Sequence, residues 1–138
     1  MNERTVNILL VEDDRVDVMN VRRAFEKSRI TIPLHTVRDG EEALEALRSG
    51  TVPRERLMIL LDLNMPRMNG IEFLRELRSD PDLRHLPVVV LTTSDDERDR
   101  LDAWELNVAG YIVKPVTFLS FVEAMNTVNR YWNLVQLP

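Results

Sequence analysis

Five short apolar runs recur along the chain at nearly regular intervals. Three of them, which read ILLV, MILL and VVVL, do not alternate polar with apolar residues. Such runs are typical of strands that helices cover on both faces of a parallel sheet. We therefore predict five strands, at Val6–Val11, Leu34–Val37, Leu57–Leu61, Val88–Leu91 and Tyr111–Val113.

Between and after these runs, apolar residues recur with the spacing of a helix that buries one face. Ser94-x-x-Glu97 has the form of a capping box at the start of the fourth helix, and Asp80-Pro81 is expected to end the third. The predicted buried faces consist of Val18, Val21 and Phe25; Ala43, Leu44 and Leu47; Ile71, Phe73, Leu74 and Leu77; Leu101, Trp104 and Val108; and Phe118, Phe121, Val122, Met125, Val128 and Trp132.

A strand followed by a helix, repeated five times, predicts a doubly wound α/β fold with right-handed crossovers. The expected sheet is flavodoxin-like, with five parallel strands in the order 2-1-3-4-5 and five helices. We find no internal repeat, low-complexity tract or linker in the 138 residues. We therefore expect a single domain over residues 1–138, without an output domain.

Composition argues against several classes of protein. The net charge of −5 disfavours a nucleic-acid-binding surface, which needs an excess of Lys and Arg. The chain contains no cysteine, which excludes disulfides, thiolate metal sites and cysteine nucleophiles. No apolar run approaches the roughly 20 residues of a membrane span, and no signal peptide is evident. We therefore expect a cytoplasmic protein that binds neither nucleic acid nor membrane.

Polar residues follow four of the five predicted strands. Glu12 and Asp13 come directly after the first strand, Asp62 after the third, Thr92 after the fourth and Lys114 after the fifth. In open α/β sheets, ligands bind beyond the carboxyl ends of the strands, near the point where the strand order reverses. The acids of the first and third strands are therefore expected to be neighbours at that point.

Three crowded carboxylates repel one another, so a hard divalent cation is expected among them. Magnesium prefers oxygen ligands, a few carboxylates and retained waters. We predict a Mg²⁺ site formed by Glu12, Asp13 and Asp62, with one backbone carbonyl such as that of Asn64.

The same arrangement suits phosphoryl transfer. A carboxylate of Asp62 can act as an in-line nucleophile and form an aspartyl phosphate. The ammonium of Lys114 and the hydroxyl of Thr92 can hold the other oxygens of the phosphoryl group, while the cation neutralises the incoming donor. We therefore predict that Asp62, Lys114 and Thr92 carry the chemistry.

Four motifs in chain order resemble the response-regulator receiver domains of two-component signalling. The resemblance extends over nearly the whole chain, and one departure is Asn107-Val108, where Gly-Ala is usual. The matching motifs are Leu10-Val11-Glu12-Asp13-Asp14, Leu61-Asp62-Leu63-Asn64-Met65-Pro66 with Asn69-Gly70, Val90-Leu91-Thr92-Thr93, and Tyr111-Ile112-Val113-Lys114-Pro115.

The resemblance implies the same roles for these residues and adds two features. In the family pattern, Asp62 is phosphorylated and its neighbours arrange Mg²⁺ and the phosphoryl group. Tyr111 resembles the family's switch aromatic, which is expected to follow Thr92 inward and reshape the surface of the fourth helix, fifth strand and fifth helix. The Lys114-Pro115 bond resembles the family's cis peptide.

A finer resemblance is to the stand-alone regulators partnered with phytochrome histidine kinases. It rests on the string VLTTSD, on residues 35–44 and on the ending Tyr131–Pro138. It implies a sensor histidine kinase of phytochrome type as partner and, together with the apolar last helix, a homodimer. The family's kinase-docking surface corresponds here to Arg15, Val16, Met19, Pro115 and Val116.

The expected function is therefore that of a two-component response regulator. It accepts a phosphoryl group from a histidine kinase onto Asp62 and signals by conformational change and protein–protein contacts. We expect no enzymatic role beyond its own phosphorylation and dephosphorylation. Two alternatives stay open. A haloacid-dehalogenase-like, Mg²⁺-dependent phosphatase needs a second acid where Asn64 stands, and a non-phosphorylated pseudo-receiver would use the fold for binding alone.

Simpler roles are expected for several other residues. Asp14 serves mainly as an acid in the first turn of a helix, where the helix dipole favours it. Ser94 either caps the fourth helix or tunes the lifetime of the phosphate, as the family's residue does at this position. His35 and His85 have no partner at metal-ligand or catalytic spacing, so we expect both at the surface.

Overall fold

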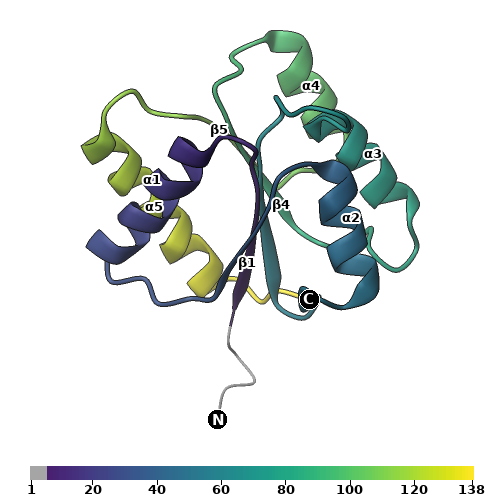
Figure 1. The fold of residues 1–138 in the computed structure, drawn as a ribbon, viewed down its shortest axis with the longest axis horizontal. Helices are drawn as coiled ribbons and strands as arrows, with labels where there is room; N and C mark the ends of the chain where they lie inside the picture. The colour runs from purple at the N-terminus through teal and green to yellow at the C-terminus, as the bar shows by residue number, and fades with distance from the viewer. Residues whose placement is uncertain (1–5) are drawn as a thin grey trace.

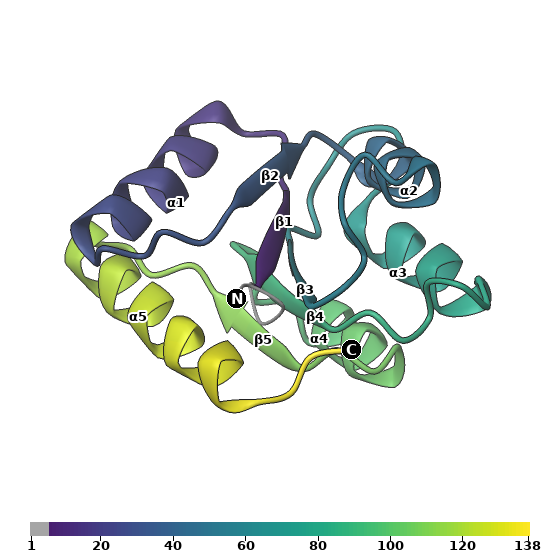
Figure 2. The ribbon, with the colours of Figure 1, turned by 90° about the horizontal axis from the view of Figure 1, so that it is seen from below.

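A computed structural model describes residues 6–138 and contains one parallel sheet with helices on both faces. The strand order is β2-β1-β3-β4-β5, as the sequence predicted. In Figures 1 and 2, α1 and α5 cover one face, and α2, α3 and α4 cover the other. The elements are β1 (Asn7–Val11), α1 (Arg15–Lys27), β2 (Leu34–Val37), α2 (Gly40–Ser49), β3 (Leu57–Leu61), α3 (Gly70–Ser79), β4 (Val88–Thr92), α4 (Glu97–Glu105), β5 (Gly110–Val113) and α5 (Phe118–Leu134).

The central strands lie between two hydrophobic layers, one on each face of the sheet. All residues of β3 and β4 are buried, which explains why their sequences lack alternation. Leu9, Ile59 and Phe73 belong to the layer under α2, α3 and α4, whereas Phe25 and Trp132 belong to the layer under α1 and α5. The Phe25 and Trp132 rings meet edge to face, with centroids 6.4 Å apart.

Polar side chains at the helix starts satisfy backbone N–H groups that have no partner within the helix. Asp14, expected as an acid of the first turn, is the N-cap of α1, and Asp39 caps α2. In α3, Asn69 and Glu72 form a reciprocal capping box with hydrogen bonds of 2.9 and 3.0 Å. Because these caps directly follow the loops at the carboxyl ends of the strands, they also fix where the site loops end.

The start and the buried face of α4 were predicted wrongly. Asp96, not Ser94, caps this helix, because its carboxylate accepts N–H bonds from Arg98 and Asp99. Leu101 is 55% exposed, and Trp104, expected to pack in the core or at an interface, is 49% exposed. The expected face extended to Val108, but the helix ends at Glu105, so that buried residue lies in the following loop.

Arg78 explains how the end of α4 is held in place. Its guanidinium donates to the carbonyls of Leu106 (2.8 Å) and Asn107 (3.0 Å), just after α4. It also donates to the carbonyls of Arg84 and Leu86, before β4. One side chain of α3 thus ties α4 to the segment that leads into β4.

Two smaller expectations were also wrong. His35 is half-buried in β2, where it pairs in register with Leu9, and its Nε2 is buried without a hydrogen-bond partner. This half-buried position differs from the surface position expected for both histidines, whereas His85 is exposed, as expected. The Lys114–Pro115 peptide is trans, as are all others among the described residues. The trans form is favoured by about 0.5–1 kcal/mol for bonds before proline.

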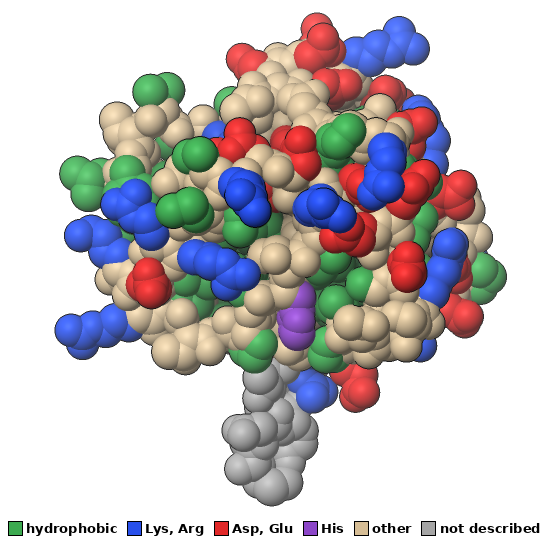
Figure 3. Space-filling model, viewed as in Figure 1, with side chains coloured by type: hydrophobic (Ala, Val, Ile, Leu, Met, Phe, Trp, Pro, Cys, Tyr) green, Lys and Arg blue, Asp and Glu red, His purple; other side chains and the backbone are tan. Residues whose placement is uncertain are grey.

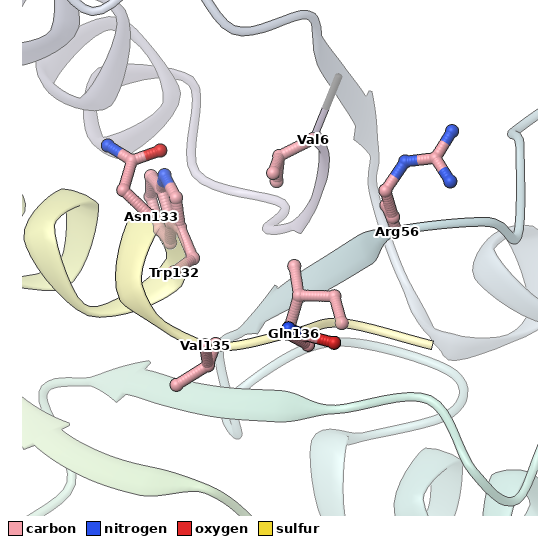
Figure 4. A pocket seen from close by; sticks show the side chains of 7 residues that line it. Val6, Arg56, Trp132, Asn133, Val135 and Gln136 are labelled. Atoms are coloured by element: carbon pink, nitrogen blue, oxygen red, sulfur yellow. The ribbon is translucent and has the colours of Figure 1, made fainter. Parts of the chain in front are cut away.

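A pocket lies at the amino ends of the strands, away from the predicted site. In Figure 4, Val6, which precedes β1, lies between Trp132 of α5 and Arg56 just before β3. The last residues of the chain pass beneath it, and the backbone N–H of Arg56 donates to the carbonyl of Pro138 over 2.6 Å. This pocket is therefore separate from the strand-end acids.

Among residues 6–138, no helix has the combination of length and hydropathy that a membrane span requires. On the face shown in Figure 3, acidic and basic side chains are interspersed, and the described residues form no broad basic patch there.

Candidate functional site

Three acids meet at the carboxyl ends of β1 and β3. The parallel register pairs Val11 with Leu61, so Glu12 and Asp62 follow adjacent strands at the same level. One carboxylate oxygen each from Glu12, Asp13 and Asp62 lies within 4.8 Å of the others. Glu12 and Asp62 are buried, whereas Asp13 is exposed, so the cluster opens toward solvent on one side. The structure thus brings together the acids that the sequence analysis expected to meet.

Lys114 reaches the same cluster from the loop after β5. Its backbone N–H donates to the carbonyl of Thr92 over 2.7 Å, which anchors the loop beside β4. Its Nζ lies 2.6 Å from Glu12 Oε1 and 2.8 Å from Asp17 Oδ2, and the side chain is 9% exposed. Lys114 was predicted from the sequence, whereas Asp17, in the first turn of α1, was not.

The charges in this cluster are not fully balanced. Burial raises the pKa of Glu12 to about 7; the hydrogen bond from Lys114 opposes this shift, and the charge of Asp62 adds to it. Burial alone would lower the pKa of Lys114, but its bonds to Asp17 and Glu12 outweigh burial and raise that pKa. The lysine therefore stays charged, while Glu12 is readily protonated because burial and repulsion both act on it.

Asp62 has a free acceptor in the middle of this cluster. Its Oδ1 is buried and has no hydrogen-bond partner, which is costly unless another group binds it. An unpartnered carboxylate oxygen beside two further acids fits a hard divalent cation, which prefers oxygen ligands. Asn64, whose carbonyl was predicted as a further ligand, is exposed two residues later.

Ser94 connects the two predicted switch residues. Its backbone N–H donates to the Thr92 hydroxyl over 3.2 Å, and its carbonyl accepts from the Tyr111 hydroxyl over 3.0 Å. Its own hydroxyl donates to Asp99 over 2.7 Å. Thr92 is fully buried and Tyr111 is half-buried, so a movement of the loop at Ser94 would affect both residues.

The loop after Asp62 folds closely onto its surroundings. A Cβ on Gly70 would lie 2.6 Å from the Asp62 carbonyl, so no side chain fits there. Arg67 has a φ of 60°, which is uncommon for residues other than glycine. Its guanidinium forms an ion pair with Asp39, including a bond from Nε of 2.8 Å. The loop is thus fastened to the start of α2, a contact that the sequence analysis missed.

Two of the five predicted kinase-docking residues line a groove together with the acids. Arg15, Val16 and Met19 are exposed on α1, and Arg15 and Met19 line a groove that also includes Glu12 and Asp13. In the loop before α5, Val116 is fully exposed and Pro115 is half-buried. In Figures 1 and 2, α1 and α5 pack side by side, so these residues lie on neighbouring elements.

Comparison with known proteins identifies the family. The family model of the response regulator receiver domain matches residues 8–126. This chain is a response regulator receiver domain. Its five-stranded sheet and helices match the receiver fold, and a histidine kinase is the class of partner that this family implies.

Individual relatives support the same family. The receiver is 38% identical to the response regulator Rcp1 of Synechocystis sp. over 95% of its own length and 92% of the relative. It is also 38% identical to the probable methanogenesis regulatory protein FilR2 of Methanothrix harundinacea, over 91% of this chain and 82% of the relative.

Solved structures agree with these sequence matches. The Mn²⁺-bound form of Rcp1 superimposes with a TM-score of 0.86 at 37% identity, over 96% of this chain and 99% of that one. The phosphorylated cyanobacterial phytochrome response regulator RcpA also gives 0.86, at 36% identity, over 96% and 98%. The receiver is therefore similar in fold to regulators of phytochrome signalling.

Proposed function

We propose that Asp62 accepts the phosphoryl group in this response regulator. The observation that carries the proposal is the buried, unpartnered Oδ1 of Asp62, placed among two further acids and near a charged lysine. Glu12, Asp13, Asp62 and the Asn64 carbonyl would hold Mg²⁺, which supplies positive charge to the phosphoryl oxygens when bound. The Mn²⁺ in the Rcp1 structure supports a divalent cation at this kind of site.

Three side chains of the protein have different roles in the transfer of the phosphoryl group. An oxygen of Asp62 forms the new bond to phosphorus, while the bond from phosphorus to the donor breaks and the donor keeps those electrons. Lys114 moves from Glu12 toward the negative charge on the transferred group, which its flexible stem allows. The hydroxyl of Thr92, which accepts from the N–H of Ser94, turns to donate to a phosphoryl oxygen.

The signal would leave the site through Ser94. Movement of Thr92 toward the phosphoryl group weakens the hydrogen bond that its hydroxyl accepts from Ser94. The Ser94 carbonyl, which accepts from the Tyr111 hydroxyl, then shifts, and Tyr111 is released from its position. The surface formed by α4, β5 and α5 changes as a result, where Leu101 and Trp104 are exposed. A phosphorylated structure that keeps both Ser94 hydrogen bonds would contradict this switch.

Phosphorylation by a small donor tests the proposal directly. Incubation with acetyl phosphate and Mg²⁺ should add one phosphoryl group to the wild-type protein, detected by intact mass. Asp62→Asn should add none, because the amide cannot act as the nucleophile, and omission of Mg²⁺ should abolish labelling. A wild-type protein that binds Mg²⁺ but is never labelled would instead support the pseudo-receiver alternative, and the family match does not favour the phosphatase alternative.

We further propose a phytochrome-type histidine kinase as the specific partner, supported by the similarity to Rcp1 and RcpA. It would dock on Arg15, Val16, Met19, Pro115 and Val116. Arg15→Glu should slow transfer from the kinase at least tenfold, since a reversed charge repels a complementary surface. Labelling by acetyl phosphate should stay unchanged, and equal transfer from the kinase would refute this docking surface.

A homodimer is proposed as the assembly. Tyr131, Leu134 and Val135 at the end of α5 are exposed, whereas Trp132 is buried in the protein's own core. Sedimentation velocity that shows monomer alone at high micromolar concentration would refute it. We also propose that the protein consists of a single receiver domain and acts in the cytoplasm.

A further inference from the structure

The ammonium of Lys114 is held by two acids that differ in position. Glu12 belongs to the group of three acids whose oxygens lie within 4.8 Å of one another, and Asp17 does not. Both acids lie within 2.8 Å of Nζ. One partner of the lysine is therefore expected to bind the cation, and the other is left out of the cation's ligand set.

A simpler role for Asp17 would be structural. It lies in the first turn of α1, where the helix dipole favours a negative charge, and its backbone N–H donates to Asp14 over 3.3 Å. Its side chain, however, reaches Lys114 in the loop after β5, 97 residues away in the sequence. A role confined to the helix would not need this contact, which joins α1 to the site.

Cation binding would make the two contacts unequal. A divalent ion held by Glu12 would compete with Lys114 for the charge of that carboxylate, so the contact between Glu12 and Lys114 would weaken. A lysine has a long stem with several rotatable bonds, and without a second partner its ammonium would be free to turn toward solvent. The 70% of the Asp17 side chain that is shielded from solvent makes its contact stronger than an ordinary surface pair.

We propose that Asp17 is a positioning residue, which keeps the Lys114 ammonium at the edge of the acid cluster while the cation occupies Glu12. The arriving phosphoryl group then meets a charge that is already in place. This inference rests on the proposed phosphorylation of Asp62 and assigns Asp17 a part in the same site.

The test compares Asp17→Asn with Glu26→Gln, an equal change of charge at an exposed position of the same helix. Two quantities are measured at saturating Mg²⁺: labelling by acetyl phosphate, and binding of beryllium fluoride as an unreactive phosphoryl analogue. Asp17→Asn should weaken both about tenfold, as expected for loss of one charge-assisted hydrogen bond. Glu26→Gln should match the wild type, and Asp17→Glu should restore most of the loss.

Three outcomes would overturn the inference. One is equal labelling and equal beryllium fluoride binding in Asp17→Asn and Glu26→Gln. A second is a loss that Asp17→Glu does not restore and that comes with a lower unfolding midpoint, since that result indicates a structural role. A third is a loss in Asp17→Asn that disappears when the Mg²⁺ concentration is raised further, since weaker Mg²⁺ binding would then account for it. Failure of the wild type itself to be labelled would instead refute the function proposed for Asp62.

Discussion

Two groups of charged side chains lie at the carboxyl edge of this receiver, and they differ in how completely they are paired. In the first, Lys114 is shared between Glu12 and Asp17, and Asp62 keeps an unpartnered oxygen. In the second, Asp39 accepts from Arg67 through one oxygen and from the backbone N–H of Glu42 through the other. Both groups tie together loops that are distant in the sequence.

The pKa shifts reflect this difference. Burial alone would raise the pKa of Asp39, but the bonds from the Glu42 backbone and Arg67 outweigh burial and lower it. Glu12, in contrast, has its pKa raised to about 7 despite its lysine partner. Asp39 is therefore fully charged and satisfied at neutral pH, whereas Glu12 is readily protonated. A pocket that must receive a cation and a phosphoryl group benefits from groups whose charge is incompletely matched.

The largest expected effect comes from breaking the satisfied pair. Asp39→Ala should lower the free energy of unfolding by about 2 kcal/mol, because it removes both a helix cap and a buried acceptor for Arg67. Asp39→Asn should cost less than half of that, since asparagine caps helices equally well. Denaturant unfolding followed by circular dichroism measures both values.

The comparison would fail if Asp39 took part in the chemistry. Both Asp39 variants should be labelled by acetyl phosphate within about twofold of the wild type under conditions where they are folded. If Asp39→Asn is stable but is not labelled, the Asp39–Arg67 pair belongs to the functional cluster, and the contrast between the two groups disappears.

A smaller effect concerns the pH dependence of cation binding. Below about pH 7, Mg²⁺ must displace a proton from Glu12, so its affinity should fall about tenfold for each pH unit. Above that pH the affinity should level off. Calorimetric titration at several pH values measures this profile, and Glu12→Gln should bind more weakly with a flatter curve. An unchanged wild-type affinity between pH 5.5 and 8 would contradict the raised pKa.

Stability without the cation should change in the matching direction. Between pH 4.5 and about 7, folded Glu12 binds more protons than the unfolded chain, so its contribution to the free energy of unfolding decreases as pH rises through this window. Asp39 has the opposite sign: its contribution is complete above pH 3.8 and is lost as pH falls through its lowered folded pKa. Of these two groups, only Glu12 should therefore change its contribution to the free energy of unfolding when the pH is varied near neutrality.

Much of this structure could be predicted from the sequence, because the signals are local or follow from the fold. The apolar runs predicted the first and last residue of each strand to within one position. The parallel arrangement then placed Glu12 next to Asp62, since residues that directly follow neighbouring strands must meet. The residues that stand out at strand ends, including Lys114, could be found in this way.

The contacts that were missed depend on side chains that cross between elements. Arg67 has a left-handed backbone and contacts Asp39, and no pattern of residue types indicates either feature for an arginine. Asp17 lies in the first turn of α1, but nothing in the sequence shows that Lys114, 97 residues away, reaches it. Val108 was assigned wrongly to the face of α4 because apolar spacing does not reveal where a short helix ends.

The two tryptophans of this receiver lie in opposite surroundings, Trp132 at 1% exposure and Trp104 at 49%. Their fluorescence can therefore be separated without any label: the buried indole emits at shorter wavelength, and a soluble quencher such as iodide reaches only the exposed one. Trp104 lies on α4, within the surface proposed to change, so quenching of the native protein is an optical reporter of signalling. Trp132 serves as the internal reference in the same cuvette.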